Sequence, residues 1–369
     1  MKLQSIDLIP VKLPYKRPVS DAWGVYPASF CGIVVAKDEA GLEGYGEISL
    51  AWFGGVHNLC KDAQENWIPS LLGMDTGDLT AINEILDSFC TFSRRNILVK
   101  AGIEMAIWDL LGKELKMPVY KLLGGKLRNE LPLTGGIAME SPEEMMEQAN
   151  RAVEAGFREL KIKVGLDDKK DLEVVRAIRA VIPDDIALRA DANMAWTNRK
   201  QAKYLMDALF DYGVHMVEQP LDYRDIEGLK WLRENSRCKV LIDEGIWDWH
   251  DAAKYIMAGA ADLLHVYACE AGGIMGMKRV FDTAGAFSME CTIGSMPEGI
   301  VGASAAAHVA AAMSNLSRLP SDLRGFTVFA DDVATTPMRI QNGRLILPDG
   351  IGLGFEIDAE KLEKLRTDR

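Results

Sequence analysis

The sequence predicts an α/β fold whose central part is a closed parallel barrel, with an α+β region before it and a hairpin segment after it. A short aliphatic run followed by an amphipathic helix repeats about every 25 to 28 residues. Seven or eight such units over about 190 residues favour a closed barrel over an open doubly wound sheet. No GxGxxG motif follows the first run, which also disfavours the open sheet.

The region 1–125 reads as the α+β part. "LQSIDLIPVKL" and "CGIVVAKDEAGLEGYGEI" alternate apolar and polar residues, as antiparallel strands do. From about Asn58 the pattern is helical, and "ILVKAGIEMAIWDLLGKELK" carries an apolar stripe at helical spacing. Pro118 and the pair Gly124-Gly125 end this region.

The barrel is predicted over residues 126–320. Its aliphatic runs are "LPLTGGIA", "ELKIKVG", "IALRADAN", "VHMVEQPL", "KVLIDEG", "ADLLHVYACEAGG" and "FSMECTIGSMPEG". Ser141 followed by Glu144 predicts a capping box on the first intervening helix. Residues 321–369 break the repeat. Their short runs and the Asn342-Gly343 turn indicate hairpins that return to the first region.

The composition of the chain limits which partners and which cellular compartment we expect for the protein. The net charge of −12 argues against nucleic acid and against an anionic membrane as partners. The start of the chain lacks the features of a signal peptide, and no apolar run approaches the roughly 20 residues that span a bilayer. Six scattered cysteines without a CxxC pair indicate reduced thiols, so we expect a cytoplasmic protein.

Three consecutive runs end in a carboxylate. Asp191, Glu218 and Asp243 follow the third, fourth and fifth runs, and Asn193 comes two residues after Asp191. Chemistry in a β/α barrel lies at the carboxyl ends of the strands, where these side chains would meet. Three carboxylates would repel one another without a cation. Oxygen-only ligation indicates Mg²⁺, or Mn²⁺, and excludes zinc and copper.

Two lysines share one face of the second run. In "ELKIKVG", Lys161 and Lys163 alternate with aliphatic residues. Taken alone, such lysines are usually a solvated face, and an aspartate at a strand end is usually a helix N-cap. The ordered set KxK, DxN, EQP and DE at β/α spacing favours the other interpretation. We therefore expect both lysines to point into the barrel beside the carboxylates.

At this point the sequence resembles the enolase superfamily, in its mandelate racemase/muconate lactonizing enzyme subgroup. The resemblance extends over essentially the whole chain. It rests on "AGIEMAIWDLLGKELKMPVYKLLGG", "LKIKVG", "LRADAN", "MVEQPL", "LIDEG", "AGGI" and "GSMPEG". It implies a (β/α)7β TIM-like barrel with an α+β capping domain built from both termini. It also implies one Mg²⁺ bound by Asp191, Glu218 and Asp243, and a homo-oligomer.

The resemblance also implies a reaction. It is removal or delivery of a proton at the carbon α to a carboxylate, through a metal-stabilised enediolate. By match to KxK, Lys163 is the base and Lys161 holds the carboxylate of a small-molecule substrate. Glu298 matches a glutamate of the family's eighth-strand region that contacts the carboxylate end of the substrate, which makes Glu298 a substrate-binding residue.

The sequence departs from the subgroup at the sixth run. Tyr267 stands where a second lysine usually faces the KxK lysine, and "SMECTIGSM" offers no histidine in its place. One-base chemistry is therefore favoured, a cycloisomerase or a hydroxy-acid dehydratase with Tyr267 as acid or hydrogen-bond donor. The alternatives are an epimerase or racemase of an amino-acid derivative or dipeptide, and a non-catalytic metal- and carboxylate-binding protein. Tyr267 could also only shape the pocket.

Substrate specificity is expected to come from loops. We expect contacts from Asn193 and from six further residues, Trp23, Tyr26, Phe53, His57, Ser295 and Met296. Aromatic loop residues also commonly pack between domains. The cap loops contain no arginine beyond the Lys16-Arg17 edge, which favours a ring, an apolar group or a sugar over a dicarboxylate.

Overall fold

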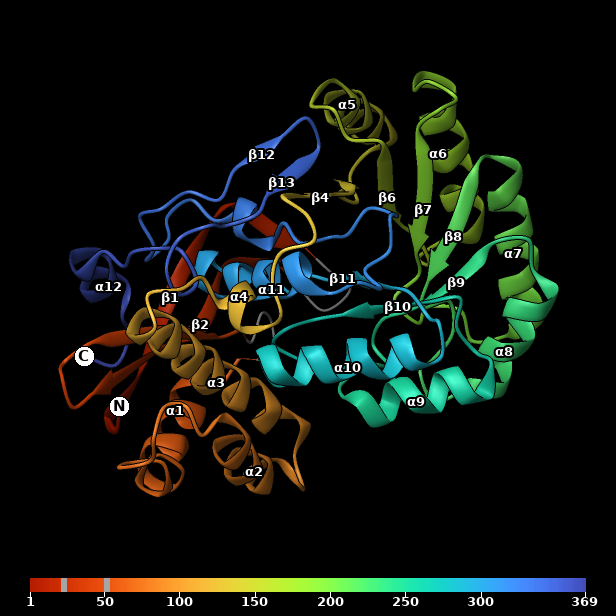
Figure 1. Cartoon of the computed structure of the whole chain (residues 1–369). Coiled ribbons are helices and arrows are strands. Elements are labelled where there is room, and N and C mark those ends of the chain that lie inside the picture. Colours follow the sequence, from red (N-terminus) through yellow and green to blue (C-terminus); the bar gives the residue numbers. More distant parts are fainter. Residues whose placement is uncertain (21–24, 50–53) are drawn as a thin grey trace.

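A seven-stranded parallel sheet forms the centre of the molecule. The computed structural model describes residues 1–20, 25–49 and 54–369. The strand order is β11-β10-β9-β8-β7-β6-β5 (Figure 1). The strands are β5 (Gly135–Ile137), β6 (Glu159–Lys163), β7 (Ala187–Asp191), β8 (Val214–Glu218), β9 (Lys239–Ile242), β10 (Leu263–Val266) and β11 (Cys291–Ile293).

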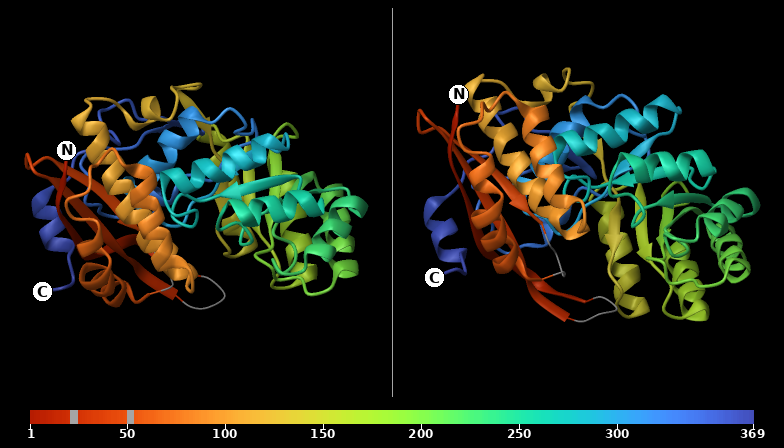
Figure 2. Two further views of the ribbon diagram at one scale, coloured as in Figure 1. Left: turned by 60° about the horizontal axis from the view of Figure 1, so that its bottom comes forward. Right: turned by 90° about the horizontal axis from the view of Figure 1, so that it is seen from below.

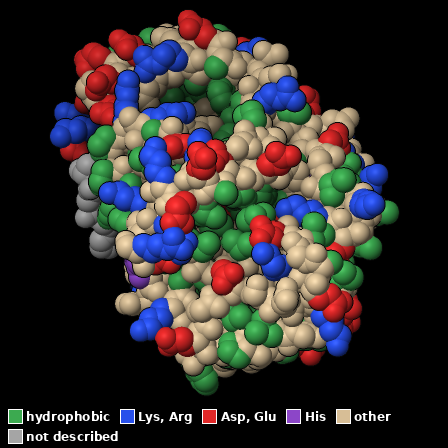
Figure 3. All heavy atoms as spheres, turned by 90° about the vertical axis from the view of Figure 1, so that its left-hand side faces the viewer, with side chains coloured by type: hydrophobic (Ala, Val, Ile, Leu, Met, Phe, Trp, Pro, Cys, Tyr) green, Lys and Arg blue, Asp and Glu red, His purple; other side chains and the backbone are tan. Residues whose placement is uncertain are grey.

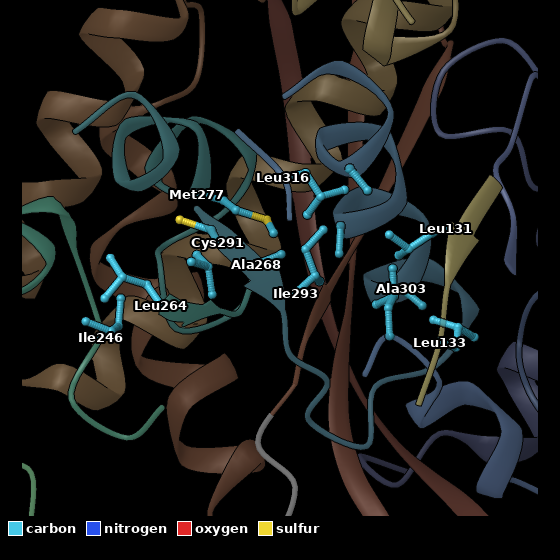
Figure 4. Close-up of a cluster of buried hydrophobic side chains, with 14 of the residues drawn as sticks. Leu131, Leu133, Ile246, Leu264, Ala268, Met277, Cys291, Ile293, Ala303 and Leu316 are labelled. Carbon is cyan, nitrogen blue, oxygen red and sulfur yellow. The ribbon is translucent and has the colours of Figure 1, made fainter. Parts of the chain in front are cut away.

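Helices alternate with these strands, as the repeat predicted. They are α5 (Pro142–Glu154), α6 (Asp168–Val181), α7 (Arg199–Asp211), α8 (Ile226–Asn235), α9 (Trp249–Ala258), α10 (Ile274–Ala286) and α11 (Ile300–Ala312). Ser141 caps α5 in the predicted capping box with Glu144. Apolar side chains fill the space between strands and helices, and Figure 4 shows the part where β10, β11, α10 and α11 meet.

The segment 316–322 closes the ring between β11 and the start of the barrel. On one side it forms a parallel bridge from Leu316 to Cys291, and Asp322 N donates to Ile293 O at 2.7 Å. On the other side Ser321 bridges Leu133, and Thr134 N donates to Ser321 O at 2.9 Å. This irregular segment is therefore the eighth barrel element, and the predicted fold class is confirmed.

The N-terminal region forms an antiparallel sheet covered by helices, here called the cap. Its strands are β1 (Leu3–Ser20), β2 (Val25–Asp38) and β3 (Glu43–Ile48), in that order. Its helices are α1 (Val56–Asn66), η1 (Ile68–Ser70), α2 (Leu79–Cys90), α3 (Arg94–Glu114) and α4 (Val119–Leu122). The cap stands beside the barrel with α12 on its outer side (Figure 2).

The C-terminal part returns to the cap. Its elements are η2 (Gly325–Val328), β12 (Ile340–Gln341), β13 (Arg344–Ile346) and α12 (Ala359–Leu365), and β13 pairs with β4 (Glu130–Pro132). Phe329 bridges Tyr15, and Arg366 bridges Val11, both on β1. The predicted return of the chain to its first region is thus observed, while the exact domain boundaries stay a prediction.

Two buried glutamates of the cap bind the amino ends of barrel helices. Glu47 accepts hydrogen bonds from Gly299 N at 2.9 Å and Gly302 N at 3.0 Å, at the start of α11. Glu104 accepts from Ile274 N at 2.7 Å and Met275 N at 2.8 Å, at the start of α10. Carboxylates favour helix amino ends because the free N–H groups and the helix dipole point at them. These four bonds fix the cap on the barrel.

Two surface features bear on partners. Acidic and basic side chains are interspersed on the face in Figure 3, without a large patch of one sign there. Within the described residues, no helix combines the length and apolarity needed to cross a bilayer.

All six cysteines are free thiols, and all except Cys90 are buried.

Candidate active site

Both predicted lysines lie in the barrel mouth. Lys161 is buried, and its Nζ contacts three carboxylates, Glu218 Oε1 at 2.6 Å, Asp191 Oδ2 at 3.1 Å and Asp322 Oδ2 at 3.0 Å. Lys163 Nζ lies 2.6 Å from Asp191 Oδ2 and is 40% exposed, so it faces the open side. The strand register brings these lysines and carboxylates together, because Lys163 pairs with Asp191, which pairs with Glu218 on the next strand.

Burial and mutual repulsion set the charges of the carboxyl groups. Burial tends to raise the pKa of Asp191, but Lys161 and Lys163 outweigh it and hold that pKa below its usual value. Burial, with Asp191 beside it, raises the pKa of Glu218 to about 8. Burial and the neighbouring carboxylates likewise raise the pKa of Asp243 well above its usual value. The cluster therefore has more carboxylates than its lysines neutralise.

The donor set fits a hard divalent cation. Asp191, Glu218 and Asp243 are 0%, 0% and 6% exposed and supply only oxygen. Glu218 Oε2 is buried without a hydrogen-bond partner, so it is available as a ligand. In the described part of the chain, no three Asp, Glu, His or Cys side chains lie close enough together to hold a metal. Asp191 and Glu218 contact the ammonium groups of Lys163 and Lys161 in place of a metal ion.

Two residues in the left-handed backbone region brace the cluster. Asn193, at φ 40°, accepts from Lys163 Nζ at 2.7 Å and donates to Glu244 Oε1 at 3.0 Å. Gln219, at φ 36°, accepts from Asp243 N at 2.9 Å. Non-glycine residues adopt this conformation uncommonly, although asparagine does so more readily than glutamine. Asn193 is therefore placed to orient Lys163, besides its predicted contact with substrate.

Tyr267 directly follows β10 and is 9% exposed. Its ring occupies the space over Gly294, where an added Cβ would lie 2.2 Å from Tyr267 Cζ. It also meets the ring of His265 edge to face, at 5.4 Å between centroids. Burial and the nearby acids, Asp243 first, raise the pKa of the Tyr267 phenol well above its usual value. The phenol therefore keeps its proton, as an acid or hydrogen-bond donor requires.

The assignment of Glu298 to the eighth-strand region was wrong. Glu298 lies between β11, the seventh strand, and α11. Its Oε1 accepts from Ser295 Oγ at 2.7 Å, and it lines a small cavity of about 10 Å³ together with Tyr267 and Met296. That volume suits about one water molecule. Burial raises the pKa of Glu298 well above its usual value and so favours its neutral form beside the tyrosine.

The cap residues divide into three groups. Tyr26 lies on β2, next to the end of the β1–β2 pairing at Val19. His57 is not brought to the barrel mouth, because its Nε2 contacts Thr367 Oγ1 at 2.8 Å, and α1, the cap helix that carries it, lies apart from β6–β9 (Figure 1). Trp23 and Phe53 lie outside the described residues.

Sequence reasoning missed two residues of the mouth, Asp322 and Arg324. Asp322 ends the closing segment and joins Lys161 at 3.0 Å to Arg324 Nε, also at 3.0 Å. Continuing the repeat of about 25 residues beyond Cys291 leads to this segment. The aliphatic signal is weak there, because "SRLPSDLRG" contains a proline and few apolar residues.

Comparison with known sequences decides the family. Residues 5–124 match the profile of the mandelate racemase / muconate lactonizing enzyme N-terminal domain, and residues 144–361 match that of the enolase C-terminal domain-like family. The chain belongs to the mandelate racemase / muconate lactonizing enzyme family of the enolase superfamily. The resemblance drawn from the motifs is confirmed.

Proteins that are similar to this chain include epimerases and cycloisomerases. The hydrophobic dipeptide epimerase of Enterococcus faecalis is 33% identical over 87% of this chain and 90% of its own length. The L-Ala-D/L-Glu epimerase of Clostridium acetobutylicum is 33% identical, covering 94% and 96%. The crystal structure of 2-chloromuconate cycloisomerase from Rhodococcus opacus superposes with a TM-score of 0.93 at 27% identity, covering both chains fully.

Proposed function

We propose that this protein is a Mg²⁺-dependent enzyme, with Mn²⁺ as an alternative ion, that removes or delivers a proton at the carbon α to a carboxylate. The observation that carries the proposal is the pair Lys161 and Lys163 in the mouth, in contact with two of three converging acids. Asp191, Glu218 and Asp243 would hold the metal. When bound, the ion supplies positive charge to the substrate carboxylate as negative charge accumulates on it.

The chain's own residues divide the remaining work. Lys163, the more exposed lysine, exchanges the proton with the α carbon. Lys161 stays an ammonium: burial alone would lower its pKa, but the carboxylates, Asp191 first, raise it well above its usual value. It therefore serves as a fixed cation for the substrate carboxylate. Asn193 holds Lys163 in place.

Tyr267 makes a one-base reaction the first choice, a cycloisomerisation or the loss of water from a hydroxy acid. A buried phenol with a raised pKa can donate a hydrogen bond or a proton to a leaving group, but it is a poor base. Epimerisation is the second candidate, because two relatives at 33% identity are named epimerases. It needs an acid and a base on opposite faces of the carbon. We further expect a cytoplasmic homo-oligomer.

The test is a mass-spectrometric screen in D₂O with Mg²⁺, over pooled muconates, hydroxy acids, amino-acid derivatives and dipeptides. A ring-closed isomer or loss of water supports one-base chemistry, whereas one deuterium in substrate of inverted configuration supports epimerisation. Lys163→Ala should abolish the reaction, and Lys169→Ala, an exposed lysine 86% accessible on α6, should leave it unchanged. Carboxylate binding without any conversion would favour the non-catalytic alternative.

A further inference from the structure

Arg324 lies inside the barrel mouth, although no part of the sequence pattern predicted it there. On β5 a Cβ added at Gly135 would face α5, 2.9 Å from Ala152 Cβ. The next residue, Gly136, faces the opposite way, into the barrel. A Cβ there would lie 1.5 Å from Arg324 Nη2. The guanidinium therefore occupies the interior space that Gly136 leaves free.

The guanidinium is a close neighbour of Lys161. Gly136 and Lys161 are register partners on β5 and β6. The two cations share Asp322, whose Oδ2 lies 3.0 Å from Lys161 Nζ and whose Oδ1 lies 3.0 Å from Arg324 Nε. Two groups bound to one carboxylate are within about 9 Å of each other. A small molecule held by Lys161 can therefore reach Arg324.

The outer nitrogens of Arg324 are available to such a molecule. Nε is used by Asp322, while Nη1 and Nη2 have no hydrogen-bond partner among residues 1–20, 25–49 and 54–369. The side chain is 31% exposed, so solvent and substrate can reach it. Its backbone is held by Thr327 N, which donates to Arg324 O at 3.0 Å, and by Arg324 N, which donates to Asp322 O at 2.7 Å. These bonds and the contact of Nε with Asp322 aim the side chain at the mouth.

We propose that Arg324 is a specificity-determining residue that binds a second acceptor group of the substrate. That group is a carboxylate or an acyl carbonyl, a few bonds from the carboxylate that Lys161 holds. A guanidinium with two free parallel N–H groups matches planar oxygen acceptors. The proposal rests on the proposed function for the role of Lys161. It reverses the expectation drawn from arginine-free cap loops, because the arginine comes from the residues that directly follow the closing segment 316–322.

A role limited to holding Asp322 is the competing explanation. Asp322 already has Lys161 at 3.0 Å and Thr134 Oγ1 at 2.9 Å. A purely structural partner for Asp322 would not need a fork whose Nη atoms point away from it into the mouth. If Arg324 only paired with Asp322, replacing Arg324 would leave the preference between ligands unchanged. A binding experiment therefore separates the two explanations.

The experiment compares two probes that differ only in the second group. Glutarate and pentanoate have the same carbon number, and each is titrated calorimetrically into full-length, Mg²⁺-loaded protein. We expect wild type to bind glutarate about tenfold to one hundredfold more tightly, and Arg324→Met to lose that preference while still binding pentanoate. Arg344→Met is the matched control, since Arg344 on β13 pairs with Glu130 on β4, outside the barrel. It should keep the wild-type preference.

A second variant tests the same site without deleting the charge. Gly136→Ala must displace the guanidinium, since its Cβ would meet Nη2 at 1.5 Å, and it should also reduce the preference for glutarate. Equal affinity of wild type for both probes would overturn the proposal, and so would a preference that survives in Arg324→Met. Neither result bears on the exchange of the α-proton by Lys163 in D₂O. The D₂O screen therefore tests the proposed function independently of the role of Arg324.

Discussion

Replacing Glu47 with glutamine should change how the stability of this protein depends on pH. Glu47 is fully buried where the cap meets α11, and it accepts bonds from Gly299 N, Gly302 N and Ser49 Oγ. Burial, and next the nearby Asp332, raise the pKa of Glu47 from 4.5 to about 7. The folded protein therefore holds this proton more tightly than the unfolded chain does.

The sign and size follow from that difference. Below pH 4.5 both states are protonated, and Glu47 imposes no penalty. Between pH 4.5 and 7 the unfolded chain loses the proton first, so the free energy of unfolding falls as pH rises. At about 1.4 kcal/mol per pKa unit, the loss reaches about 3 kcal/mol above pH 7. Glutamine has no proton to lose, and its amide N–H₂ costs a pH-independent amount by facing a backbone donor.

The assay is urea unfolding of wild type and Glu47→Gln at several pH values from 4 to 8. The variant should start less stable and gain about 3 kcal/mol relative to wild type across this range. Glu65→Gln, at an exposed position of α1, serves as control, and its difference from wild type should stay constant. A constant difference for Glu47→Gln would refute the reasoning, since it would mean that the carboxyl titrates alike in both states.

Two further predictions concern the mouth. Glu218→Gln should weaken Mg²⁺ binding at least tenfold in calorimetry, because it removes a charged ligand whose Oε2 has no hydrogen-bond partner in the protein; unchanged affinity would remove Glu218 from the metal site. Gly294→Ala should push the Tyr267 ring aside, at a cost of about 1 to 3 kcal/mol in unfolding free energy. Tyr267→Phe keeps the ring and should leave stability unchanged while it slows turnover. Equal turnover in Tyr267→Phe and wild type would mean that Tyr267 only shapes the pocket.

The sequence predicted those parts of the barrel that have a strong local pattern. Aliphatic runs at regular spacing marked β5 to β11, and alternation in "ELKIKVG" indicated which way Lys161 and Lys163 point. Strand ends then grouped Asp191 and Glu218 with them, since parallel strands end at one edge. The catalytic and ligand roles of these residues remain predictions.

Other parts could not be predicted because their positions depend on distant contacts. Asp322 reaches Lys161 only because an irregular segment with Pro320 is held between two strands by backbone bonds. Glu298 was misplaced because no local signal separates the seventh strand region from the eighth. His57 resembles a loop ligand in sequence, yet its partner Thr367 is 310 residues away.

The closing segment has a consequence for biosynthesis. Strand β1 pairs first with its neighbour β2, but two of its partners, Phe329 and Arg366, are made more than 300 residues later. The ring likewise stays open until residues 316–322 emerge, so the outer edge of β5, which is made about 180 residues earlier, stays unpaired while about half of the chain is synthesised. Since synthesis runs at about 5 to 20 residues per second, this edge stays exposed for about 10 to 40 seconds. Chaperone demand should therefore be concentrated before the closing segment is made, and a chain truncated shortly before residue 316 should aggregate.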